Sequence, residues 1–399
     1  MRTGVKRFFV GCLAALSLHG GGAAAASCGT AEWPLWHDFG VHFIQDSGRV
    51  LDASTAMQHS SSEGQSYGMF FALVAGDKRM FDRLWGWTID NLSGGDAGRR
   101  LPAWIWGRAD DGSWRVIDDN SASDANLWFA YALLEAGRLW QEPAYTRQAN
   151  ALLDLIESQE VADLPGLGPM LLPGREWFAK PQEQTWQLNA SYLPIPLLRR
   201  LALARPQGPW RAIADNTAAM VEATAPHGLA PDWTTYQAKE TPPSFVVDPI
   251  KGPVGSYDAI RNYLWAGLTS SDDPLFSRML RALDGMVSAT RQHGEGIPPE
   301  SVDTQTGGAS GQGPFGFSAA LIPYFKAKGQ ALLLEQQIQR VRDALPRSLE
   351  PGAVALGQPP YYDHVLSLFG TGWLDGMYRF RPDGTLSLSW ENECFATTE

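Results

Sequence analysis

Hydrophobic residues recur along the chain with the 3.6-residue period of α-helices, and six of the helical segments begin in a similar way. Each opens with small or polar residues and continues into an apolar, aromatic-rich helix. The openings are SSSEGQSYGMFFAL from residue 60, SASDANLWFAYALL from 121, NASYLPIPLLRRL from 189, GSYDAIRNYLWAGL from 255, GPFGFSAALIPYF from 313 and YYDHVLSLFGTGW from 361. Comparable polar residues in successive openings lie 45 to 67 residues apart, which indicates an internal repeat.

Amphipathic helices with polar outward faces fill the intervals between these openings. They are expected at residues 78–92, 143–158, 209–223, 273–290 and 330–344. Six pairs of a hydrophobic and an amphipathic helix predict an all-α fold, an (α/α)6 barrel in which an inner ring is wrapped by an outer ring. Short β-prone segments at 113–117 and 385–390 predict minor β-hairpins at the rim. A helical bundle with separate cores is the alternative.

The first 26 residues resemble a secretory signal peptide. Three basic residues precede an apolar run from Phe8 to Leu18, and small residues follow at 24–26. The apolar run is too short to span a bilayer. We therefore expect an exported protein, periplasmic or secreted, without a stable membrane anchor. No low-complexity linker divides the remaining chain, which predicts a single catalytic domain over 27–399.

Cysteine usage fits an oxidising compartment. Cleavage after residue 26 removes Cys12 and leaves Cys28 and Cys394 near the two ends of the mature chain. A disulfide between them is the expected arrangement. A lipid anchor at Cys28 is the alternative, which the absence of a large aliphatic residue three positions earlier disfavours.

The charge balance disfavours a phosphate-rich partner. The formal net charge of −11 becomes −14 when the three basic residues of the signal peptide are removed, whereas nucleic-acid binding draws on dense Lys and Arg. Sixteen Trp and eleven Tyr are many for this length, and flat aromatic faces suit sugar rings as well as protein cores. A neutral or cationic ligand is therefore allowed, while core burial is expected for most of the aromatic residues.

Three of the six openings place a carboxylate in the first helical turn: Glu63, Asp124 and Asp258. Helix capping would explain each one separately, and Ser60-x-x-Glu63 matches a capping box. In a toroid, however, the inner helices run parallel and their N-termini gather at one end. The three carboxylates would then line one pit, an arrangement that capping does not require.

An acidic pit flanked by aromatic residues suits hydrolysis of glycosidic bonds. This reaction needs one carboxylic acid with a raised pKa and a second carboxylate that attacks or activates water. No metal-binding spacing, phosphate-binding loop or nucleophile elbow occurs, so neither a metal nor another cofactor is expected. The candidate substrate-binding residues are Tyr67, Trp104, Trp106, Asn126, Trp128, Tyr192, Trp233, Tyr257 and Arg261.

Six motifs resemble glycoside hydrolase family 8, in the same order along nearly the whole mature chain. They are SEGQSYGM, LPAWIWG, SASDANLWFAYALLEAGRLW, GLGPMLLPG, SYDAIRNYLWAG and GPFGFSAAL. Within the family the likeness is greatest to the periplasmic endoglucanases of bacterial cellulose-secretion systems. The resemblance implies an (α/α)6 barrel and endo-hydrolysis of β-1,4-glucan with inversion of configuration. It also implies a cellulose chain as substrate and a cellulose synthase or export complex as a possible partner.

The same resemblance assigns roles to the three carboxylates. Glu63 corresponds to the general acid, Asp258 to the general base that activates water, and Asp124 to the aspartate that holds the sugar beside the scissile bond. Inversion requires about 6.5–9.5 Å between the acid and the base. Asn126 stands where the family usually has a second aspartate, and the loss of that charge is expected to shift Asp124 toward ionisation.

Two alternatives stay open at this point. One is a non-catalytic glucan-binding accessory of a polysaccharide synthase, which would bind glucan without releasing reducing ends. The other is a hydrolase of a different β-1,4-linked polymer, such as chitosan or xylan.

Overall fold

The computed structural model describes Met1, residues 31–350 and residues 358–391. Apart from Met1, the expected signal peptide lies outside the described residues, as do Cys28 and Cys394. Among the helices of the described part, none is both long and apolar enough to cross a membrane.

Six helices form a closed inner ring. They are α2 (Ser62–Val74), α4 (Ser123–Leu139), α6 (Ile195–Ala204), α8 (Ile260–Leu268), α11 (Phe315–Ala327) and α13 (Tyr361–Leu374). Each packs against the next in this order. The ring closes where Phe369 of α13 contacts Tyr67 and Phe70 of α2, with ring centroids 5.3 and 5.6 Å apart. The predicted (α/α)6 barrel is confirmed.

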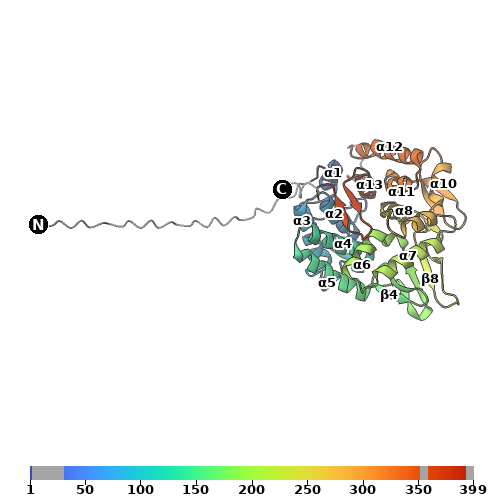
Figure 1. The fold of residues 1–399 in the computed structure, drawn as a ribbon, viewed down its shortest axis with the longest axis horizontal. Coiled ribbons are helices and arrows are strands. Elements are labelled where there is room, and N and C mark those ends of the chain that lie inside the picture. Colours follow the sequence, from blue (N-terminus) through green and yellow to red (C-terminus); the bar gives the residue numbers. More distant parts are fainter. Residues whose placement is uncertain (2–30, 351–357, 392–399) are drawn as a thin grey trace.

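The remaining helices surround this ring, as Figure 1 shows. They are α1 (Pro34–Phe43), α3 (Lys78–Leu92), α5 (Pro143–Gln159), α7 (Trp210–Thr224), α9 (Phe276–Ala282), α10 (Gly285–Gln292) and α12 (Ala331–Ser348). The expected single helix over 273–290 is divided into α9 and α10, because Leu283 and Asp284 form a turn between them.

Strands are more numerous than the sequence pattern predicts. The described residues contain five antiparallel sheets. They consist of β1 (Ser60–Ser61), β2 (Ile105–Arg108) and β3 (Trp114–Asp118); β4 (Val161–Leu164) and β5 (Gly168–Leu171); β6 (Ala179–Lys180), β7 (Thr185–Leu188), β8 (Thr234–Gln237) and β9 (Ser244–Val247); β10 (Val254–Gly255), β11 (Pro299–Asp303) and β12 (Ala309–Gln312); and β13 (Tyr378–Phe380) and β14 (Leu386–Leu388).

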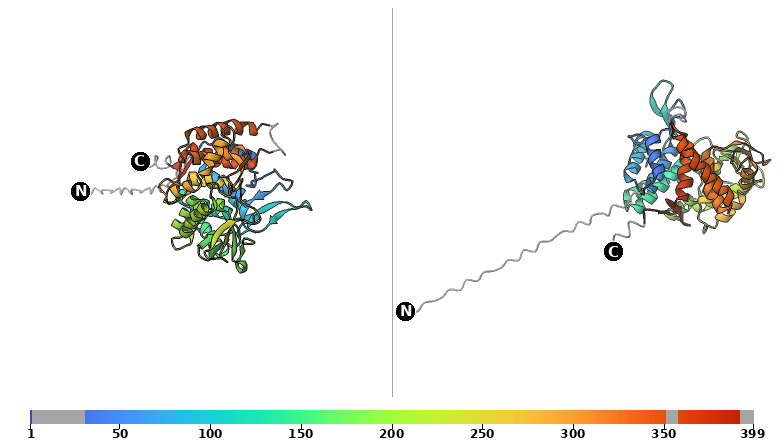
Figure 2. Two further views of the ribbon diagram at one scale, coloured as in Figure 1. Left: turned by 90° about the vertical axis from the view of Figure 1, so that its right-hand side faces the viewer. Right: turned by 90° about the horizontal axis from the view of Figure 1, so that it is seen from above.

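The position of these strands matters for the site. The predicted segments at 113–117 and 385–390 correspond to β3 and β14, and the β2–β3 hairpin projects from the barrel (Figure 2, cyan). β1 leads directly into α2, and β10 and β12 end shortly before α8 and α11. The sheets that contain them therefore build up the rim at the end where the inner helices begin.

Inner helices approach one another closely where glycine replaces a side chain. Gly370 of α13 faces α11, and a Cβ added there would overlap with the carbonyl oxygen of Ala319. Gly86 of α3 offers a contrast, because nothing lies within 4 Å of the position that its Cβ would occupy. A larger side chain would therefore clash at Gly370 in the inner ring, whereas it would fit at Gly86 in the outer ring.

These two glycines give a matched test of the packing. Gly370→Ala is expected to lower the free energy of unfolding by about 1–3 kcal/mol, because α11 and α13 must move apart. Gly86→Ala is expected to raise it by about 0.5–1 kcal/mol, since alanine is favoured over glycine within a helix. Urea denaturation of both variants measures the difference, and equal effects would contradict the proposed close approach.

Candidate active site

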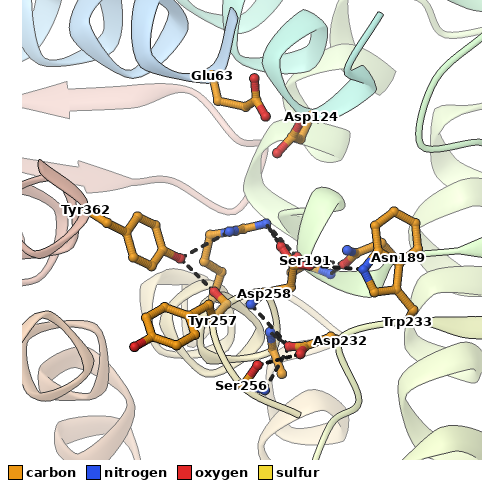
Figure 3. Close-up of polar contacts among 12 residues, drawn as sticks. Glu63, Asp124, Asn189, Ser191, Asp232, Trp233, Ser256, Tyr257, Asp258 and Tyr362 are labelled. Carbon is orange, nitrogen blue, oxygen red and sulfur yellow. Dashed lines mark hydrogen bonds and ion pairs between the residues drawn. The ribbon is translucent and has the colours of Figure 1, made fainter. Parts of the chain in front are cut away.

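A cleft of about 700 Å³ lies where the inner helices begin, and all three predicted carboxylates line it. Glu63 comes from the first turn of α2 and Asp124 from the first turn of α4, whereas Asp258 precedes α8 by two residues. Figure 3 shows Glu63 and Asp124 close to one another, with Asp258 across from them. The repeat therefore brings together groups that are distant in sequence, as predicted.

Glu63 does not act as a helix cap. Ser61 is the N-cap of α2, and its hydroxyl accepts a hydrogen bond from the backbone N–H of Gly64 (3.1 Å). The Glu63 carboxylate instead accepts hydrogen bonds from the Ser62 hydroxyl (3.0 Å) and the Trp104 indole (2.9 Å). No capping box forms, and the carboxylate is free to face the cleft.

Glu63 and Asp124 form an acidic pair in which the pKa of both carboxyl groups is raised. Burial raises the pKa of Glu63, against the effect of its hydrogen bonds and of Arg261. Burial, and then the charge of Glu63, raise the pKa of Asp124 well above its usual value. The expected shift of Asp124 toward ionisation is thus outweighed by burial. A pair in this state can supply a proton to a leaving group.

Asp258 is held as an acceptor on both carboxylate oxygens. Its Oδ1 pairs with the Arg261 guanidinium (2.9 Å), and its Oδ2 accepts a hydrogen bond from the Trp233 indole (3.1 Å). Arg261 is itself fixed by donating to the hydroxyls of Ser191 (2.9 Å) and Tyr362 (3.1 Å). These contacts fix the orientation of the Asp258 carboxylate in the cleft.

Five of the predicted substrate-binding residues line this cleft. They are Tyr67, Trp104, Tyr192, Trp233 and Arg261. The aromatic members present rings to a space that also contains the three carboxylates, which suits the apolar faces and hydroxyl groups of sugar rings.

Asn126 is placed differently from the expectation. It is fully buried and does not line the cleft. Its side-chain amide donates to Glu160 (2.9 Å), which also accepts a hydrogen bond from Ser121 (2.6 Å). Burial raises the pKa of Glu160 to about 7. Asn126 therefore stabilises the start of α4 from within the protein. The prediction that it contacts sugar is wrong, because its side chain is buried away from the cleft.

Three aromatic residues are likewise outside the cleft. Trp128 is 1% exposed and packs in the barrel centre, because its helical position faces the inner ring. Trp106 packs between Trp87 and Trp114 on one face of the hairpin. Tyr257 is 45% exposed, and its hydroxyl donates to a carboxylate at the rim. Burial corrects the prediction for Trp128, whereas substrate binding by Trp106 and Tyr257 stays a prediction.

Several residues that line the cleft are not among those predicted from the sequence. Phe178 lies parallel to Trp233, with ring centroids 5.8 Å apart, and the neighbouring Trp177 is 82% exposed. Tyr361 and Tyr362 begin α13. The two tyrosines open the sixth repeat, so the repeat itself could have identified them. Trp177 and Phe178 follow the GLGPMLLPG motif in a loop that has no such signal.

Because the pKa of Glu63 is raised and Asp258 lies across the same cleft, the site has the acid and the second carboxylate that hydrolysis of a glycosidic bond requires. The sequence model of glycosyl hydrolases family 8 matches residues 10–376, and the chain belongs to this family.

Named relatives cover nearly the whole chain. An endoglucanase of Pseudomonas fluorescens is 48% identical over 94% of this chain and 95% of its own length. One from Xanthomonas axonopodis is 50% identical, with 94% of each chain covered. The crystal structure of the endo-1,4-D-glucanase from Vibrio fischeri matches with a TM-score of 0.81 at 37% identity, and covers 90% of this chain and 99% of its own.

The hydrogen bonds of Glu63 predict a change in pH dependence. The Ser62 hydroxyl stabilises the Glu63 carboxylate, so Ser62→Ala is expected to raise the pKa of Glu63 further. The acid then keeps its proton to higher pH, and the basic limb of the kcat/KM profile moves upward. Trp104→Phe removes the second donor and is expected to move the limb in the same direction. A downward or absent shift in both variants would contradict this assignment.

Proposed function

We propose that the protein is an endo-β-1,4-glucanase that inverts configuration, with Glu63 as general acid and Asp258 as general base. The observation that carries the proposal is that Ser61, and not Glu63, caps α2, while Glu63 lines the same cleft as Asp258. A carboxylate that only capped α2 would turn back toward its own helix. The membership of the family supports the same reading.

In the proposed reaction a glucan chain lies in the cleft with its scissile bond between Glu63 and Asp258. Glu63 donates its proton to the leaving glycosidic oxygen. Asp258 accepts a proton from a water molecule, whose oxygen attacks the anomeric carbon from the opposite face. About 6.5–9.5 Å between the two carboxyl groups accommodates this water.

Asp124 has a supporting role in this proposal. An inverting reaction forms no covalent glycosyl-enzyme intermediate, so Asp124 is not required as a nucleophile. Its carboxylate accepts a hydrogen bond from the backbone N–H of Ala125 (2.8 Å). It lies beside Glu63, where it can also accept a hydrogen bond from a sugar hydroxyl. Its second role is electrostatic, because its proximity disfavours ionisation of the acidic pair.

The proposed substrate is a neutral β-1,4-glucan such as cellulose. The relatives that match over most of both chains carry the name endoglucanase. Exposed Trp177 and the stacked rings of Phe178 and Trp233 offer apolar faces beyond the carboxylates. Such platforms suit a polymer that extends past the cleaved bond, as internal cleavage requires.

We further propose that the protein is exported and acts on cellulose as it is synthesised. The signal-like residues 1–26 and the expected disulfide between Cys28 and Cys394 support export. The likeness to endoglucanases of cellulose-secretion systems supports a place beside a cellulose synthase. Detection of the mature chain in the periplasmic or extracellular fraction, beginning near residue 27, tests the first part of this proposal.

Substitution of the two carboxylates tests the proposed chemistry. Glu63→Gln and Asp258→Asn are each expected to lower turnover of carboxymethylcellulose by about 10²–10⁴-fold while the fold survives, because each removes one proton-transfer step. Glu222→Gln on the outer helix α7 is a matched control, and its turnover should equal that of the wild type. Reducing-sugar release measures turnover, and circular dichroism monitors folding.

Product analysis separates the remaining alternatives. Proton NMR of a soluble cello-oligosaccharide digest should show the α-anomer first, and initial β-anomer would overturn inversion. Binding without any reducing ends would favour the accessory protein instead. Faster turnover of xylan or chitosan than of carboxymethylcellulose would change the proposed substrate.

A further inference from the structure

Helix α8, which follows the proposed base, has no cap of its own. Its N-cap residue, Ala259, has no side-chain acceptor, and the first N–H groups of the helix donate to backbone carbonyls of the preceding turn. The N–H groups that need an outside acceptor are those of Ser256, Asp258 and Ala259 in that turn. Buried helix starts need acceptors for these groups. In this structure the acceptor comes from a distant segment, at Asp232.

The Asp232 carboxylate accepts four hydrogen bonds from the turn that contains Asp258. Its Oδ1 accepts the backbone N–H groups of Ser256 (2.8 Å), Asp258 (3.1 Å) and Ala259 (2.7 Å). Its Oδ2 accepts the hydroxyl of Ser256 (2.6 Å). The backbone N–H of Asp232 in turn donates to the carbonyl of Val254 (2.7 Å). Figure 3 shows this cluster beside the cleft residues.

The residue next to Asp232 completes the attachment. The Trp233 indole donates to Oδ2 of Asp258, so two consecutive residues hold the backbone and the side chain of the base. The two segments approach so closely at Gly255 that a Cβ there would overlap with the carbonyl oxygen of Ala230. The position of Asp258 is therefore set by the segment that contains Asp232 and Trp233.

We propose that Asp232 is a positioning residue for the general base, holding the turn from Ser256 to Ala259 so that Asp258 faces the attacking water. This inference rests on the proposed role of Asp258. Asp232 is the acceptor in all four hydrogen bonds, and both of its oxygens take part. Both oxygens can act only as acceptors when the group is an ionised carboxylate. A negative charge at the start of α8 is also favoured by the helix dipole.

Two substitutions at this position separate geometry from charge. Asp232→Ala removes all four acceptor contacts. Asp232→Asn keeps one carbonyl oxygen for the three N–H groups, while its amide can donate to the Ser256 hydroxyl. The asparagine variant therefore preserves much of the turn and removes only the charge.

We expect Asp232→Ala to lower kcat on a soluble cello-oligosaccharide by about 10²-fold with little change in KM, since the base is displaced but the sugar platforms remain. Asp232→Asn should recover most of the lost kcat. Asp383→Ala is the control for stability, because Asp383 holds a turn between β13 and β14 by similar bonds to Thr385.

The result that would overturn the inference is a wild-type kcat in Asp232→Ala, with only a lower melting temperature such as Asp383→Ala also shows. If Asp232→Ala does not fold, Asp232→Glu decides, because it keeps the charge but displaces the acceptor oxygens by one methylene group: a lowered kcat with unchanged KM supports the inference, and a wild-type kcat overturns it. Glu63→Gln and Asp258→Asn are measured in the same assay, so that failure of the proposed catalytic roles can be distinguished from failure of the proposed role of Asp232. Full activity in those variants would refute the proposed catalytic roles, whereas their inactivity together with an unaffected Asp232→Ala would refute the role of Asp232 alone.

Discussion

The ion pair between Arg261 and Asp258 is the interaction on which the organisation of this site depends. The Arg261 guanidinium is buried, which by itself lowers its pKa, but nearby phenols and carboxylates outweigh this effect and keep it charged. It binds Asp258 directly and offsets part of the rise that burial causes in the pKa of Glu63 and of Asp124. A buried charge that lost its partner would be costly, so the carboxylates and the arginine have to be placed together. The cleft can hold three acidic groups because this positive charge lies among them.

The barrel supplies the geometry that makes this possible. Parallel inner helices begin at one end, and each start brings polar groups and free N–H donors to the same cleft. The sequence then uses these starts differently. Ser61 caps α2, so that Glu63 can face the cleft, whereas Asp232 accepts the N–H groups of the turn that precedes α8. Capping and catalysis are thus assigned to separate residues, which allows Glu63 to keep a raised pKa instead of being ionised at a helix start.

The sequence predicts the ring and the carboxylates well, because both follow from helical periodicity and a repeat that places equivalent residues at one end. It predicts the aromatic residues less well. Trp128 lies one turn beyond Asp124 on the same helix, and periodicity does not reveal that its ring points into the core and not into the cleft. Most strands are also missed, since they are two to five residues long and are stabilised by pairing with distant segments. Asp232 was missed for the same reason, because its four donors lie more than 20 residues away.

The central claim is that Glu63 is a catalytic acid with a raised pKa and not an ionised helix cap. Carbon-13 NMR of protein labelled at the glutamate carboxyl carbons tests this directly, with the Glu63→Gln variant identifying the resonance. The account predicts a Glu63 carboxyl signal whose titration midpoint lies well above the value of about 4.3 for an unperturbed glutamate. A midpoint at or below that value would contradict the account, since Glu63 would then be ionised when the reaction requires its proton.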